Sequence, residues 1–81
     1  MRILGLILLK QFKKTHADAR KQLDAWQSEV PRQHWLSSQD IKRRYQSADF
    51  LAENRVIFNI RGSNYRLMVR VRYQNKIVVV E

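Results

Sequence analysis

The stretch "RVIFNIRGSNYRLMVRVRYQNKIVVV", from Arg55 to Val80, decides the fold of this chain. β-Branched and aromatic residues dominate it, and two short polar breaks, "RGSN" and "QN", divide it. Such a composition favours strands, and glycine and asparagine at the breaks favour tight turns. The stretch therefore predicts three consecutive antiparallel strands, over residues 55–60, 65–73 and 76–81.

The middle strand alternates between two kinds of side chain. One face carries the apolar members, Tyr65, Leu67, Val69 and Val71. The other face carries Arg66, Met68, Arg70 and Arg72. Burying unpaired guanidinium groups would cost on the order of several kcal/mol each. The alternation therefore predicts an apolar face packed on helices and an arginine face open to solvent or to a partner.

The same alternation in the preceding strand predicts that Val56, Phe58 and Ile60 point inward. Ile57, Asn59 and Arg61 then join the arginine face. Between Asn54 and Val80 the sequence has no aspartate or glutamate, so we expect a surface that is almost free of carboxylates.

Helical patterns precede these strands. Residues 2–5 predict a short first strand, and Leu6, Leu9 and Phe12 then recur near helical spacing. A second apolar stripe follows at helical spacing and ends before Pro31; its members are Ala19, Leu23, Trp26 and Val30. Capping patterns at Thr15/Asp18 and at Ser37/Asp40 predict the starts of the second and third helices. Residues 46–54 read as a polar connection.

These elements predict one α+β domain over residues 1–81, in the order β-α-α-α-β-β-β. We expect an antiparallel sheet with helices packed on one face.

Charge is the main compositional signal. Sixteen lysines and arginines against seven acidic residues give a formal net charge of +9, which favours binding to polyanions such as nucleic acid, an anionic membrane or an acidic protein.

The sequence contains no cysteine, and His16 and His34 lack the spacing of metal ligands, so we expect no metal site. "ILGLILL" is too short to span a bilayer. The basic and apolar residues do not form a long amphipathic helix with a basic face, so we do not expect membrane binding.

The arginines on the open face favour an anionic partner. All five charges from Arg55 to Arg72 are arginines, whose planar guanidinium forks match phosphate bidentately. The pattern predicts a surface for nucleic acid or for an acidic protein. The alternative is a cationic face that only contacts water.

The segment "VIFNIRGSNYRL", followed by alternating arginines, resembles HigB-type toxins within the RelE-like group of type II toxin–antitoxin systems. The resemblance extends to "KQFKKTHADARKQLDAWQSEV" and "SADFLAENRVIFNI". It implies a cytoplasmic endoribonuclease that cuts mRNA, on the ribosome in RelE-like members. Cleavage would proceed by attack of the RNA 2′-hydroxyl, without a metal or cofactor. The implied partner is a helix-turn-helix antitoxin of the HigA type, in a hetero-oligomer with the toxin.

The resemblance also implies roles for single residues. Arg66 matches the arginine of the "YRL" motif, which lies at the scissile phosphate in RelE-like toxins. Asn59 falls where some relatives carry lysine, so it would contact phosphate or sugar but could not relay a proton. The remaining candidates for RNA binding are Arg61, Arg70, Arg72, Lys10 and Lys13.

HigB-type sequences continue past the last strand into a segment like G-T-H-A-E-Y, which supplies a histidine and a tyrosine, whereas this sequence stops at Glu81. We therefore expect a retained fold and binding surface with strongly reduced cleavage. We also expect the apolar "IVVV" strand to need cover from a partner. Two alternatives remain: a non-enzymatic RNA- or DNA-binding module, and a module that binds only its antitoxin.

Overall fold

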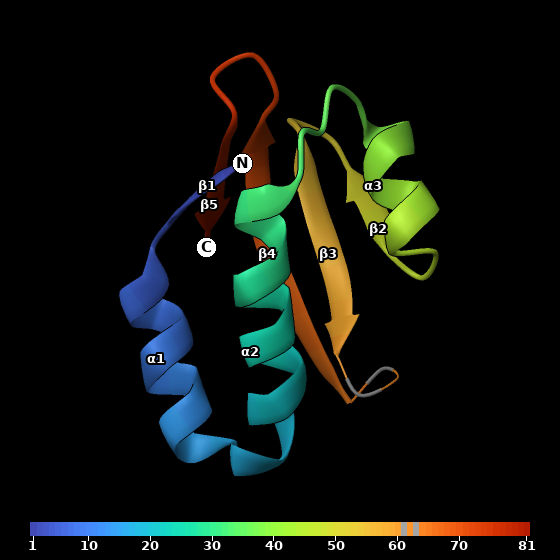
Figure 1. Cartoon of the computed structure of the whole chain (residues 1–81). Coiled ribbons are helices and arrows are strands. Elements are labelled where there is room, and N and C mark those ends of the chain that lie inside the picture. Colours follow the sequence, from blue (N-terminus) through green and yellow to red (C-terminus); the bar gives the residue numbers. More distant parts are fainter. Residues whose placement is uncertain (61, 63) are drawn as a thin grey trace.

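The computed structural model describes residues 1–60, 62 and 64–81 (Figure 1). The elements, in chain order, are β1 (Arg2–Leu4), α1 (Leu6–Thr15), the 3-10 turn η1 (Ala17–Ala19), α2 (Arg20–Glu29), the 3-10 turn η2 (Val30–Arg32), α3 (Ser38–Arg44), β2 (Asp49–Leu51), β3 (Arg55–Ile60), β4 (Tyr65–Arg72) and β5 (Ile77–Val80). The predicted α+β class is confirmed. One strand was missed, because β2 lies in the segment interpreted as a polar connection.

The five strands form one mixed sheet in the order β1-β5-β4-β3-β2. The three predicted strands β3, β4 and β5 are antiparallel, as expected, and β2 adds a further antiparallel strand beside β3. The expectation of a wholly antiparallel sheet is wrong, because β1 runs parallel to β5 with Ile3 opposite Val78. The expectation that the "IVVV" strand needs a partner's cover is wrong, because β5 lies between β1 and β4. Residues far apart in sequence supply that cover.

Gly5 makes the connection from β1 to α1 possible. It adopts φ 85°, a left-handed conformation that glycine enters without steric cost. A Cβ at this position would lie 2.9 Å from the backbone oxygen of Val80. The glycine therefore lets the chain leave the sheet while keeping close contact with β5.

The core confirms the predicted alternation of side chains. The helices lie on one face of the sheet (Figure 1), and Val56, Phe58, Val69 and Val71 are buried beneath them. The predicted stripe on the second helical segment is buried as well: Ala19, Leu23, Trp26 and Val30. Burial of these side chains is the main stabilising contribution to a domain this small.

The capping pattern at Thr15 and Asp18 is wrong. Thr15 is the last residue of α1, where its hydroxyl donates to the Phe12 carbonyl at 3.2 Å, and His16 precedes the next turn. Ser37 does occupy the N-cap of α3, but the Asp40 carboxylate accepts from the Leu36 backbone N–H at 2.8 Å.

Within the described part of the chain, no helix has the length and apolar character needed to cross a membrane.

Candidate nucleic-acid interface

The face of the sheet opposite the helices carries the predicted arginines. Arg66 and Arg72 are exposed, and Arg70 is half-buried. In the register of β3 and β4, Asn59 lies opposite Arg66 and Arg55 lies opposite Arg70. The structure therefore brings Arg66 and Asn59 together on adjacent strands, as the alternation predicts.

The expectation that this face is almost free of carboxylates is wrong. Asp49 of β2 lies 2.8 Å from the Arg66 guanidinium, measured from Oδ2 to Nη2. Glu81 lies 3.1 Å from Nε of Arg70, and Glu53 lies 3.7 Å from Nη2 of the same residue. These acids lie outside the acid-free stretch of sequence and reach the face only through the fold. The Arg66–Asp49 pair is half-exposed, and such pairs are worth about 0–1 kcal/mol, so an anionic ligand could displace the carboxylate.

A shallow hollow of about 640 Å³ surrounds Arg66. Its lining residues are Ser47, Asp49, Asn59, Gly62 and Arg66. The Asn59 side-chain amide donates to the Ser47 carbonyl at 2.5 Å, which holds this side chain beside the edge of β3. The hollow thus combines a cation, a carboxylate and an amide, groups that can bind a phosphate and orient a hydroxyl.

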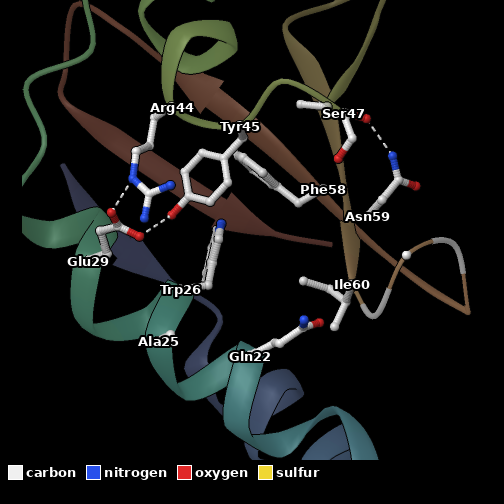
Figure 2. A pocket seen from close by; sticks show the side chains of 12 residues that line it. Gln22, Ala25, Trp26, Glu29, Arg44, Tyr45, Ser47, Phe58, Asn59 and Ile60 are labelled. Carbon is white, nitrogen blue, oxygen red and sulfur yellow. Dashed lines mark hydrogen bonds and ion pairs between the residues drawn. The ribbon is translucent and has the colours of Figure 1, made fainter.

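A second cavity, of about 240 Å³, lies between α2, the end of α3 and β3 (Figure 2). It shares Ser47, Asn59 and Gly62 with the hollow around Arg66. At its far side the Glu29 carboxylate accepts hydrogen bonds from the Tyr45 hydroxyl, at 2.8 Å, and from Nε of Arg44. No sequence pattern predicts this polar cluster, because Glu29 and Tyr45 meet only when α2 and α3 pack.

The polar cluster shifts the pKa values of its members. Burial by itself would raise the pKa of Glu29, but hydrogen bonds from Tyr45 and Arg44 outweigh it and lower that pKa below its ordinary value. Burial and the adjacent Glu29 carboxylate raise the pKa of Tyr45. Glu29 is therefore held as the anion and Tyr45 as the neutral donor.

The indole N–H of Trp26 is buried and has no acceptor among the described residues. Figure 2 shows it directed toward the aromatic rings of Tyr45 and Phe58. The rings of Trp26 and Phe58 meet edge to face, with centroids 5.5 Å apart.

The two predicted lysines are not brought to the Arg66 hollow. Lys13 is held by Asp24 at 2.7 Å and by Gln27 at 3.0 Å, between α1 and α2. Lys10 lines a separate hollow, with Lys13, Lys14, Arg20 and Asp24. Arg61, also predicted to bind RNA, lies outside the described residues.

Neither histidine lines the Arg66 hollow. His16 packs on the other side of the sheet, with ring centroids 4.2 Å from Phe12 and 5.1 Å from Tyr65. No group of three potential metal ligands gathers within the described residues. Of the described residues that line the hollow, only Asp49 carries a carboxylate. The sequence analysis did not single it out, because a three-residue edge strand gives almost no periodic signal.

The fold and the basic open face define a class of small α+β proteins of the RelE-like type. Residues 19–81 match the HigB_toxin family, described as the RelE-like toxic component of a toxin–antitoxin system. The match spans most of the chain, so this protein belongs to that family, and the predicted HigB resemblance is confirmed. No curated protein matches the chain. As a toxin of such a system, the protein has an antitoxin as its partner.

Proposed function

We propose that this toxin is an endoribonuclease that cleaves mRNA without a metal ion, through attack of the RNA 2′-hydroxyl on the adjacent phosphate. The observation that carries the proposal is the hollow on the open face, where Arg66, Asp49 and Asn59 surround a space accessible to an RNA strand. The family implies an RNA-cutting member, and the net charge of +9 favours a polyanionic substrate.

Arg66 has the central role in this proposal. Its guanidinium binds the scissile phosphate and stabilises the charge that develops on the phosphorane oxygens. The phosphate replaces Asp49 as the partner of Arg66, which costs little because their ion pair is half-exposed. Asn59 orients the ribose or phosphate by hydrogen bonding. Arg70 and Arg72 add positive charge along β4 that holds the RNA strand, and Arg61 remains a proposed contact to the RNA backbone.

Asp49 is the proposed general base. Its carboxylate takes the proton of the 2′-hydroxyl as the 2′-oxygen bonds to phosphorus. The bond from phosphorus to the 5′-oxygen breaks, and water protonates the leaving oxygen. The products are a 2′,3′-cyclic phosphate and a 5′-hydroxyl end.

Replacing Asp49 by asparagine tests two roles of this carboxylate separately: general base for the 2′-hydroxyl, and counter-ion of Arg66. Loss of a general base lowers the cleavage rate about 10²–10⁴-fold, while removal of a negative charge beside Arg66 tightens RNA binding. Single-turnover cleavage of a labelled RNA, with binding measured by fluorescence anisotropy, reports both quantities. If Asp49→Asn binds more tightly and also cleaves faster, Asp49 is only a competing counter-ion.

The second candidate function is a module that binds RNA or its antitoxin without cutting. The specific observation in its favour is that, among the described residues that line the Arg66 hollow, Asp49 alone could accept a proton and none is a histidine. Salt-dependent RNA binding with unchanged RNA ends, in buffer and in a translating extract, would favour this candidate.

The main proposal has three further parts: a helix-turn-helix antitoxin of the HigA type, action on the ribosome and a cytoplasmic location.

A further inference from the structure

The cavity between α2, α3 and β3 has a largely apolar wall and adjoins the proposed phosphate site (Figure 2). Its volume of about 240 Å³ lies below the roughly 300–1,000 Å³ of pockets for drug-sized ligands, so it suits one small ring system. The side chains of the apolar wall are Ala25, Trp26, Tyr45, Ala48, Phe58 and Ile60. Such an aromatic-rich wall is typical of sites that bind flat molecules.

Three aromatic rings of this wall pack against one another. The ring centroids of Trp26 and Phe58 are 5.5 Å apart, and those of Tyr45 and Phe58 are 5.0 Å apart, both edge to face. This packing fixes the rings before a ligand arrives, and such preorganisation lowers the cost of binding. A flat ring that entered the cavity would exchange contact with water for contact with this wall.

One polar group of the wall has no partner among the described residues. Nε1 of Trp26 is buried without an acceptor, and the whole residue is only 2% exposed. Figure 2 shows this nitrogen directed toward Tyr45 and Phe58, which line the same cavity. Most buried donors in proteins have a partner, so an unpaired one requires an explanation. An acceptor atom on a bound molecule would supply the missing partner.

The same cavity offers acceptors for a ligand's own N–H groups. The Tyr45 hydroxyl donates to Glu29 at 2.8 Å, so its oxygen can still accept a hydrogen bond. The Glu29 carboxylate has about four lone-pair sites, and its bonds from Tyr45 and Arg44 leave acceptor capacity unused. A donor and acceptors around one cavity match a nucleobase, whose edges place N–H groups beside ring nitrogens and carbonyl oxygens.

The cavity and the Arg66 hollow share part of their lining. Ser47, Asn59 and Gly62 line both, and the Asn59 side chain is fixed between them by its bond to the Ser47 carbonyl. A nucleotide whose phosphate lies at Arg66 could therefore extend its base past Asn59 into the cavity. A single RNA strand permits this, because its unstacked bases can turn outward and be recognised one at a time.

We propose that this cavity is a nucleobase pocket, which takes up the base next to the phosphate bound by Arg66 and in which Trp26 Nε1 donates to an acceptor of that base. The inference rests on the proposed function in taking RNA as the ligand of the Arg66 hollow. It does not depend on cleavage, so binding and cleavage are tested separately.

The test uses short strands of equal charge that cannot be cleaved by 2′-hydroxyl attack. Each strand consists of five abasic deoxyribose phosphate units, and in four versions the central unit carries one of the four RNA bases. Binding to the full-length protein is measured by calorimetry. We expect at least one base to bind about tenfold or more tightly than the fully abasic strand, because a base stacked on aromatic side chains commonly contributes about that factor.

The indole N–H signals in NMR locate the base. The protein has two tryptophans, Trp26 and Trp35, and both are buried, but Trp35 does not line this cavity. The base-bearing strand should shift the Trp26 indole signal and slow its hydrogen exchange at least about tenfold, while the Trp35 signal changes much less. Trp26→Phe removes one of the two signals and so assigns them.

Two matched variants test the cavity itself. Ala25→Leu places a larger side chain in the cavity, at an exposed position of α2 where leucine is a good helix former. It should abolish the advantage of the base and leave binding of the abasic strand unchanged. Ser28→Leu adds the same side chain at an exposed position of α2 outside the cavity, and it should retain the advantage. Circular dichroism checks that both variants fold.

Equal binding of all five strands would overturn the inference. A base advantage that survives Ala25→Leu, or a response of Trp35 in place of Trp26, would overturn it as well. RNA cleavage together with equal binding of the strands would refute the nucleobase pocket and leave the proposed function standing. Base-dependent binding at Trp26 without RNA cleavage would refute the proposed cleavage and leave the pocket standing.

Discussion

The two faces of the sheet differ in character although the same strands build both. On the helical side, Val69 and Val71 are fully buried, and aromatic side chains pack around Phe58. On the open side, Arg66 and Arg70 come from the same strand and pair with carboxylates that remain partly in water. The helical face holds the domain together, whereas the open face adds little stability and is available for ligands.

The strongest test of this division is a substitution beneath the helices. Phe58→Ala removes a side chain that contacts Trp26, Trp35 and Tyr45, and it should cost about 3–5 kcal/mol of unfolding free energy. Leu36→Ala is the matched control, because Leu36 is exposed, and it should cost less than about 0.5 kcal/mol. Urea unfolding followed by tryptophan fluorescence measures both. Equal costs would mean that the packed face does not dominate stability.

On the open face we expect substitutions to change RNA cleavage strongly and the free energy of unfolding only slightly. Arg66→Ala should lower RNA cleavage at least about 10²-fold, because the charge on the developing phosphorane loses its main partner. Its unfolding free energy should change by less than about 1 kcal/mol, since only a half-exposed ion pair is lost. Arg43→Ala on α3 removes the same charge outside the hollow and serves as the control in cleavage and unfolding assays. Full activity of Arg66→Ala would remove this residue from the mechanism.

The polar cluster of Glu29, Tyr45 and Arg44 is neither fully buried like the helical face nor largely exposed like the open face. It predicts that the free energy of unfolding depends on pH. Glu29→Gln should cost about 1 kcal/mol at neutral pH, because hydrogen bonds from Tyr45 and Arg44 to a charged acceptor are weakened. The folded pKa of Glu29 is lowered, so its contribution is complete above the unfolded value near 4.5 and is lost as the pH falls through the folded pKa.

The stability difference between wild type and Glu29→Gln should therefore shrink as the pH falls below about 4.5, which urea unfolding at several pH values would measure. Glu53→Gln is the control, since Glu53 is exposed and lies 3.7 Å from Arg70. A difference that does not vary with pH would show that the charge of Glu29 does not contribute.

Several features followed from the sequence because they depend on local periodicity. The alternation in residues 65–72 predicted which side chains of β4 are buried, and the stripe from Ala19 to Val30 predicted the buried side of α2 and the turns flanking it. Burial of apolar side chains dominates folding, and backbone geometry sets their period. The α+β class and the placement of Asn59 on the same face as Arg66 therefore needed no coordinates, whereas the register that sets them opposite each other came from the structure.

Tertiary structure decided what depends on contacts between distant segments. The partners of Arg66 and Arg70 come from Asp49, Glu53 and Glu81, and β1 covers β5 from the other end of the chain. A repeating pattern records which way a side chain points, but it does not record which other segment lies opposite, because packing and strand register select that neighbour.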